Sequence, residues 1–201
     1  RMNLPNKLTV SRFVFTVFFL AALFCPWPIP FRNTLALFFF CAASFTDFLD
    51  GKIARARGLI TNFGILMDPL ADKILTCSAF IAFVESSHLH ANAPVRVAAW
   101  MVIVIVAREL AITGLRLLAA SKNVVLAAEK FGKHKTVSQI VCIIALLGVD
   151  ASREWNPLLQ KFFADWLPVF AEIALWVTVA LTAISGALYL WRNRALYLED
   201  V

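Results

Sequence analysis

Apolar stretches set the strongest limit on what this chain can fold into. Six of them, over residues 8–24, 35–49, 65–84, 95–118, 137–149 and 166–190, are separated by polar segments. A membrane-spanning helix needs about 20 mostly apolar residues, so the fifth stretch is long enough only if its helix extends back into the lysine-rich segment before it. We predict an all-α integral membrane protein with six transmembrane helices and a short juxtamembrane segment at the N-terminus.

The composition agrees with a membrane protein of one domain over residues 1–201. Of the 201 residues, 61% are hydrophobic and the mean hydropathy is +0.77, which is too apolar for a soluble globule. The 18 Phe and 6 Trp are typical of lipid-facing surfaces and interfacial aromatic belts. In a membrane protein, a net charge of +6 is explained by the basic residues that set its orientation and attract anionic lipid headgroups. We therefore expect no nucleic acid partner.

The positions of the basic residues predict how the six spans are oriented. Of the 19 Lys and Arg residues, Lys73 and Arg108 fall inside spans, and only Arg32, Arg96, Arg153 and Lys161 lie on the side opposite the N-terminus. All the others lie on the N-terminal side. Because basic residues accumulate in cytoplasmic loops, we expect both termini to face the cytoplasm.

Four aspartates lie close together between the second and third apolar stretches. Asp47 and Asp50 are three residues apart, and Asp68 and Asp72 are four apart, so each pair occupies one face of a helix. Carboxylate oxygens suit Mg²⁺, Mn²⁺ or Ca²⁺, and the segment contains no Cys or His that would indicate zinc. Helix capping is the alternative, but the first pair ends an apolar run, where the helix dipole disfavours a carboxylate.

The residues around these aspartates favour phosphate chemistry. Gly51, Ala54 and Gly64 are small where a ligand would approach the backbone, and the Arg55 guanidinium can face a phosphate. Divalent ions held by carboxylates beside basic residues at a membrane surface suit phosphoryl transfer involving a lipid. One carboxylate would alternatively serve as a general base for an attacking hydroxyl.

The spacing of eight residues in this segment carries a specific resemblance. The pattern Asp47-x2-Asp50-Gly51-x2-Ala54-Arg55-x8-Gly64-x3-Asp68-x3-Asp72 is similar, position by position, to the signature of the CDP-alcohol phosphotransferases. These membrane enzymes have six transmembrane helices and move a phosphoryl-linked group from a CDP-activated donor to an alcohol, releasing CMP. The resemblance also implies a homodimer.

The resemblance assigns roles to the residues of the pattern. It implies that two divalent ions, Mg²⁺ or Mn²⁺, are held by Asp47, Asp50, Asp68 and Asp72. Asp72 would also be the catalytic base that activates the acceptor hydroxyl. The residues that would border the cytidine diphosphate are Asp47, Asp50, Gly51, Ala54, Arg55, Gly64 and Asp68.

Other segments resemble one bacterial subfamily, the phosphatidylglycerophosphate synthases. They are residues 3–12, 107–109, 114–116 and 132–139. The subfamily joins CDP-diacylglycerol to sn-glycerol 3-phosphate in the bacterial inner membrane, which implies these two substrates and an active site facing the cytoplasm. An anionic acceptor needs cations, and the candidates for its phosphate are Arg12, Arg108, Arg116, Lys133 and Lys135.

Alternatives remain for these basic residues and for the function. Arg12 would otherwise extend to lipid headgroups, and Arg108 and Glu109 would form a buried structural pair, although adjacent helical residues point about 100° apart. Another acceptor, such as inositol phosphate, serine or phosphatidylglycerol, would keep the aspartate pattern. A cation transporter is disfavoured because the aspartates gather at one face of the membrane instead of at its midplane.

Overall fold

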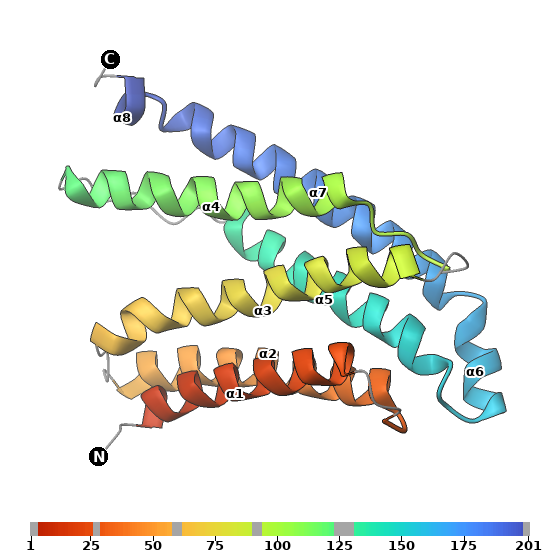
Figure 1. The fold of residues 1–201 in the computed structure, drawn as a ribbon. Coiled ribbons are helices and arrows are strands. Elements are labelled where there is room, and N and C mark those ends of the chain that lie inside the picture. Colours follow the sequence, from red (N-terminus) through yellow and green to blue (C-terminus); the bar gives the residue numbers. More distant parts are fainter. Residues whose placement is uncertain (1–3, 26–28, 58–61, 90–93, 123–130, 199–201) are drawn as a thin grey trace.

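The computed structural model describes residues 4–25, 29–57, 62–89, 94–122 and 131–198. The regular structure in these ranges is entirely helical, and Figure 1 shows how the helices are arranged. In chain order the helices are α1 Leu4–Phe24, α2 Arg32–Arg57, α3 Asn62–Leu89, α4 Ala99–Ser121, α5 Phe131–Ser152, α6 Pro157–Ala164, α7 Leu167–Arg192 and α8 Ala195–Leu198. The predicted all-α fold is confirmed.

The helices form two groups with α5 between them. Helices α1, α2 and α3 lie together in the lower half of Figure 1, and α4 and α7 lie in the upper half. Helix α5 packs against both α2 and α7, and its Cys142, Ile143 and Leu147 are almost completely buried. Phe19 of α1 and Phe40 of α2 pack with ring centroids 5.7 Å apart. Burial of such apolar side chains joins the two groups into one body.

The start of α2 is held by a residue from the distant connection between α5 and α6. The Glu154 carboxylate accepts hydrogen bonds from the backbone N–H groups of Asn33 (2.8 Å) and Thr34 (2.9 Å) and from the Thr34 hydroxyl (2.8 Å). The indole N–H of Trp155 donates to the same hydroxyl. These amides have no partner inside the helix, and a carboxylate is favourable at a helix N-terminus. The contact fixes α2 relative to α5.

Several helices are longer than the apolar stretches predicted. Helix α2 continues to Arg57, beyond the apolar stretch that ends at residue 49, because Lys52 to Arg57 contains no Pro or Gly and is rich in good helix formers. Helix α1 begins at Leu4, so the expected juxtamembrane residues from there onward belong to the same helix. Helix α5 starts at Phe131, which is the backward extension that the fifth apolar stretch required.

Two of the described helices contain segments long and apolar enough to cross a membrane, Lys135–Ser152 and Leu167–Arg192. A shorter apolar segment, Val10–Phe24, lies in α1. Helix α7 exposes large apolar side chains along its outer face, including Ile173, Ile184 and Trp191, which suits contact with lipid. The full set of six spans stays a prediction.

Candidate active site

Asp47, the first aspartate of the motif, is paired with an arginine from α1. Its Oδ1 lies 2.8 Å from Nη2 of Arg12. The Arg12 side chain is 1% exposed, whereas the Asp47 side chain is 45% exposed. A buried guanidinium needs such a partner, and the pairing leaves Asp47 open on its other side. In this arrangement Arg12 orients the carboxylate, and its predicted contact with the acceptor phosphate stays a prediction.

Asp72, the last aspartate of the motif, faces the same region from α3. It lies within electrostatic reach of Asp47, Arg12, Lys73 and Lys135, which belong to α2, α1, α3 and α5. The hydroxyl of Thr76, one turn later, donates to the Asp72 backbone carbonyl at 3.0 Å. Side chains from four helices therefore surround Asp72, and one of them is Asp47 at the other end of the motif.

The remaining residues of the motif lie on the same two helices. Asp50, Gly51, Ala54 and Arg55 follow Asp47 on α2, and Gly64 and Asp68 precede Asp72 on α3. Their side chains lie outside the described part of the structure. Asp50 is about one turn from Asp47, and Asp68 about one turn from Asp72. The backbone therefore permits the predicted carboxylate group, while the contacts of these six side chains stay predictions.

The donor chemistry fits the predicted divalent ions. Asp47 and Asp72 offer carboxylate oxygens from α2 and α3, which are the ligands that Mg²⁺ and Mn²⁺ prefer. Among the described side chains no group of three His, Cys, Asp or Glu residues forms, since two of the four motif aspartates lie outside that set. Asp47 and Asp72 are suited to bind such an ion, and metal binding itself stays a prediction.

A glutamate on α4 organises the basic residues opposite the aspartates. Glu109 accepts a hydrogen bond from Lys135 Nζ of α5, and its Oε1 lies 3.3 Å from Nη1 of Arg108. Lys135 is buried, which makes this partner necessary. Arg108 and Glu109 therefore form the structural pair that was the alternative interpretation of these residues, because the long arginine side chain folds back to its neighbour.

Lys73 connects α3, which carries Asp72, to α4, which carries Glu109. Its Nζ donates to the hydroxyl of Thr113 on α4, and that hydroxyl donates in turn to the Glu109 backbone carbonyl at 2.7 Å. Lys73 also lies within electrostatic reach of Arg116 and Asp72. Lys73 was expected inside a span but without a role, although a lysine inside an apolar stretch is itself a signal of function.

Helix α7 supports the two arginines that were predicted to bind the acceptor. The Arg116 guanidinium lies 6.0 Å from the centre of the Tyr189 ring, within the range of a cation–π contact. The Arg108 side chain lies over Gly186, where an added Cβ would be only 2.7 Å from Arg108 Cγ. Lys133 lies in the first turn of α5, and its side chain lies outside the described part.

Gln139 is a further polar residue at this site, one turn beyond Lys135 on α5. It is 2% exposed, and its Nε2 has no hydrogen-bond partner among the described residues. An unsatisfied buried amide costs about 1–3 kcal/mol, which is a reason to expect a ligand atom as its partner. The sequence analysis included Gln139 only as part of a resemblance and assigned it no role.

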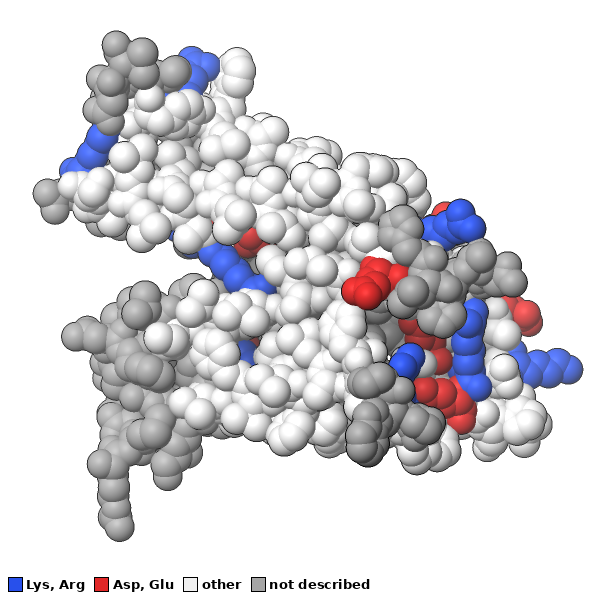
Figure 2. Space-filling view, in the orientation of Figure 1, with Lys and Arg blue, Asp and Glu red and all other residues white. Residues whose placement is uncertain are grey.

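Figure 2 shows where these elements leave open space. The molecule is hollowed on its left side, between the lower group with α3 and the upper group with α4, and Lys or Arg atoms are visible inside the hollow beside acidic atoms. Cations and carboxylates therefore share one cleft. The charges in such a cleft suit a phosphate compound, and a carboxylate there is suited to accept a proton from a hydroxyl beside it.

Comparisons with known proteins agree with this chemistry. A sequence model of the CDP-alcohol phosphatidyltransferase family matches residues 2–184. The chain is 40% identical to a CDP-diacylglycerol–glycerol-3-phosphate 3-phosphatidyltransferase of Bacillus subtilis strain 168, with 95% of each chain covered. Proteins of the same name from Escherichia coli strain K12 and Rickettsia bellii strain RML369-C are 34% and 32% identical, with 100% and 93% of each chain covered.

The extent of these matches decides the family. The matched region contains the whole aspartate pattern on α2 and α3, together with Glu109, Lys135 and the start of α7. With its apolar helices, this indicates a bacterial membrane protein. The chain belongs to the CDP-alcohol phosphatidyltransferase family.

Proposed function

We propose that the chain transfers the phosphatidyl group of CDP-diacylglycerol to sn-glycerol 3-phosphate, forming phosphatidylglycerophosphate and CMP in phospholipid biosynthesis. The relatives that it matches over almost their full length carry the name of this activity. The structural observation that supports the proposal is that Asp72 lies within electrostatic reach of Asp47, Lys73 and Lys135, which come from α2, α3 and α5. An acceptor that itself bears a phosphate explains why so many cations face the carboxylates.

On the donor side, the motif would bind the cytidine diphosphate. Asp47, Asp50, Asp68 and Asp72 would hold two divalent ions, Mg²⁺ or Mn²⁺, which when bound neutralise the diphosphate and stabilise the departing CMP. Arg55 would contact a phosphate, and Gly51, Ala54 and Gly64 would allow the nucleotide to approach the backbone. Arg12 keeps Asp47 in its orientation through the 2.8 Å ion pair.

On the acceptor side, Asp72 would take the proton of the primary hydroxyl of glycerol 3-phosphate. The oxygen would then attack the lipid-side phosphorus of the donor, and the bond from that phosphorus to CMP would break. The cations available to hold the acceptor phosphate are Arg108, Arg116, Lys133 and Lys135. Glu109 already neutralises part of the charge of Arg108 and Lys135, so the exposed Arg116 is the strongest candidate for direct contact.

The proposal includes an arrangement in the membrane. The six apolar stretches support six spans, the family resemblance supports the bacterial inner membrane, and the distribution of basic residues supports an orientation with both termini and the active site facing the cytoplasm. CDP-diacylglycerol would keep its acyl chains in the bilayer, and glycerol 3-phosphate would enter from the cytoplasm. A homodimer is expected from the family resemblance.

The test is CMP release by the purified protein with CDP-diacylglycerol and Mg²⁺ or Mn²⁺. We expect release with glycerol 3-phosphate, none with inositol phosphate, serine or no acceptor, and loss of release after chelation of the metal. Release only with another acceptor would reject the acceptor assignment and keep the donor site. Absence of release with every acceptor, from protein with intact helical content, would reject the transfer reaction itself.

A further inference from the structure

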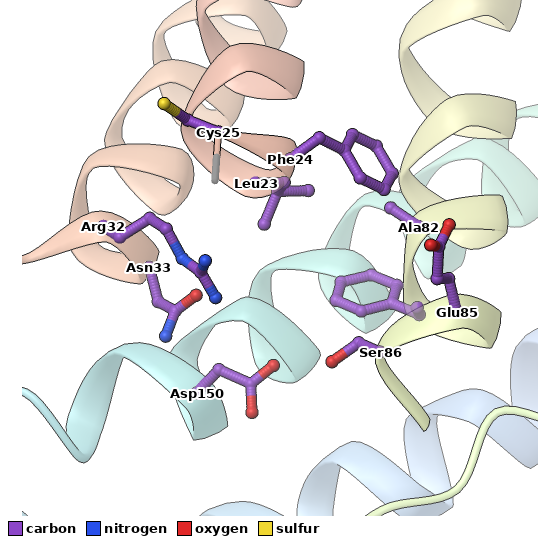
Figure 3. A pocket seen from close by; sticks show the side chains of 10 residues that line it. Leu23, Phe24, Cys25, Arg32, Asn33, Ala82, Glu85, Ser86 and Asp150 are labelled. Atoms are coloured by element: carbon purple, nitrogen blue, oxygen red, sulfur yellow. The ribbon is translucent and has the colours of Figure 1, made fainter. Parts of the chain in front are cut away.

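The connection between α5 and α7 lies at one boundary of the membrane. The apolar segment Lys135–Ser152 of α5 ends just before it, and the apolar segment Leu167–Arg192 of α7 begins just after it. Charged and polar side chains from α2, α3 and α5 gather at the same end of the molecule, and Figure 3 shows them around a cavity of about 240 Å³: Arg32, Asn33, Glu85, Ser86 and Asp150. Such side chains avoid the hydrocarbon core, so they mark where it ends.

Helix α6, Pro157–Ala164, occupies this connection and lies across the direction of α1, α2, α3 and α4 (Figure 1). Its start is set locally, because Pro157 occupies the first turn and Asn156 Oδ1 accepts a hydrogen bond from the Leu159 backbone N–H at 2.9 Å. In the described structure none of its eight residues is buried. A helix this short is marginal in water without packing, so we expect a partner outside the bundle to cover it.

The exposed surface of α6 is divided into an apolar arc and a polar arc. At about 100° per residue, Leu158, Leu159 and Phe162 fall on one side of the helix. Gln160 and Lys161 fall on the other side. The three apolar side chains are 82%, 46% and 65% exposed, although a helix packed onto the bundle would hide them. The two arcs give the pattern of a helix that lies in the plane of a membrane surface.

Aromatic contacts join α6 both to the bundle and to the lipid-facing surface of α7. The Phe163 ring packs edge-on against Trp155, with centroids 5.3 Å apart, and this fixes which side of α6 faces the bundle. Successive ring centroids 5.1, 5.6 and 6.2 Å apart then connect Phe162, Phe163, Trp166 and Phe170. Because Trp166 and Phe170 are exposed at the start of α7, the apolar arc of α6 continues a surface that already suits lipid.

We propose that α6 is an interfacial helix that lies in the membrane leaflet at the end of the molecule opposite the aspartates. Its apolar arc enters the region between the headgroups and the acyl chains, and its polar arc faces the headgroups and water. The partner is the lipid bilayer itself, because the arc adjoins the ends of two membrane-length apolar segments. The inference rests on α5 and α7 crossing the membrane and does not depend on the proposed reaction.

The test is photocrosslinking of the full chain in vesicles of dioleoyl phosphatidylcholine, a lipid without net charge. The photoreactive amino acid p-benzoylphenylalanine replaces one residue at a time: Leu158 or Phe162 on the apolar arc, Gln160 or Lys161 on the polar arc, or Ile173 on the outer face of α7 as a positive control. All these side chains are exposed, so the replacements should leave the fold intact, which circular dichroism checks. Intact mass spectrometry then measures the fraction of chains joined to one lipid.

We expect several times more lipid adduct at positions 158 and 162 than at positions 160 and 161, and about as much as at position 173. Phe162→Glu places a charge on the apolar arc and should reduce the adduct at position 158 severalfold, whereas the matched Gln160→Glu on the polar arc should leave it unchanged.

Three results would overturn the proposal while position 173 still gives an adduct. They are equal adduct on the two arcs, an adduct at position 158 that Phe162→Glu leaves unchanged, and crosslinks between two chains in place of lipid, which would mean that a second copy covers the arc. Absence of adduct at every position, including 173, would reject the membrane placement of α7 together with the proposal.

Discussion

Asp72 is the side chain on which the proposed chemistry depends most. Replacing it with Asn keeps its size and removes its ability to accept a proton, so we expect CMP release to fall at least about 100-fold. Helical content should be unchanged, because Asp72 makes no capping contact. Steady-state CMP release and circular dichroism measure the two effects, and Asp165→Asn, an exposed site at the far end, is the control. Near-normal turnover of Asp72→Asn would remove this residue from the catalytic role.

Glu109 should matter for both stability and acceptor binding. Glu109→Gln leaves buried Lys135 without its anionic partner, and breaking a buried ion pair costs about 3–5 kcal/mol. We expect a lower melting temperature and a higher KM for glycerol 3-phosphate. Adding Lys135→Met removes the stranded charge, so the double variant should regain stability without regaining activity. A double variant no more stable than Glu109→Gln would show that the pair does not act in this way.

Some side-chain positions in the candidate site could be predicted from the sequence, and others could not. Helix periodicity was enough to place Asp47 with Asp50, and Asp68 with Asp72, on one face of a helix each, whereas the expectation that the two pairs form one site came from the family resemblance. The partners of Arg12, Lys73 and Lys135 come from helices distant in the chain, and nothing in the local pattern specifies them. The contact between Arg108 and Glu109 could not be decided from the sequence, because the direction of the backbone does not determine where a flexible arginine side chain ends.

Helix α7 should influence the active site through Gly186. An alanine there would place its Cβ 2.7 Å from Arg108 Cγ, so the arginine must move. Helix propensity alone would make Gly→Ala favourable by about 1 kcal/mol. We expect Gly186→Ala to raise the KM for glycerol 3-phosphate without raising the melting temperature. At Gly148 the nearest atom, Leu167 Cδ2, is 3.5 Å away, so Gly148→Ala should be stabilising and fully active. Unchanged kinetics in Gly186→Ala would contradict the supporting role of α7.

Helix α2 should lose stability when its remote cap is removed. Glu154→Ala deletes the acceptor for two backbone amides and one hydroxyl, and the loss of a helix cap costs about 0.5–2 kcal/mol. We expect a lower melting temperature with an unchanged KM, since the cap lies at the end of α2 away from Asp47. Thermal unfolding of Glu154→Ala and of its neighbour Arg153→Gln measures this. An equal effect of both substitutions would reject the cap as the cause.

The existence of the helices was easier to predict than their ends. Helices α1 to α5 and α7 each overlap one of the six apolar stretches, whereas α6 and α8 lie outside those stretches. Helix α2 also continues beyond its apolar stretch through Lys52 to Arg57. Hydropathy marks where lipid or core can surround a helix, and a helix can continue into water when its residues favour it. The Glu154 cap was beyond prediction, because it joins residues about 120 positions apart.

The fold as a whole carries a prediction about topology. The start of α1 and helix α8 lie at the same end of the molecule in Figure 1, and the connection between α5 and α6 lies at the other. A fluorescent protein fused after residue 201 should therefore mature and fluoresce in the cytoplasm. Alkaline phosphatase fused after residue 153 should be active, because the proposed orientation puts that point on the side opposite the cytoplasm. Active phosphatase at the C-terminus would reverse the proposed orientation.

The remote cap of α2 also has a consequence during synthesis. Ribosomes add roughly 5–20 residues per second, so Glu154 arrives on the order of 10 s after Asn33 and Thr34. During that interval the first amides of α2 lack the partner that they have in the finished protein. Early release or a stall before Glu154 would leave α2 with a frayed start, accessible to membrane proteases. The start of α2 therefore becomes fully hydrogen-bonded only after Glu154, in the last third of the chain, has been synthesised.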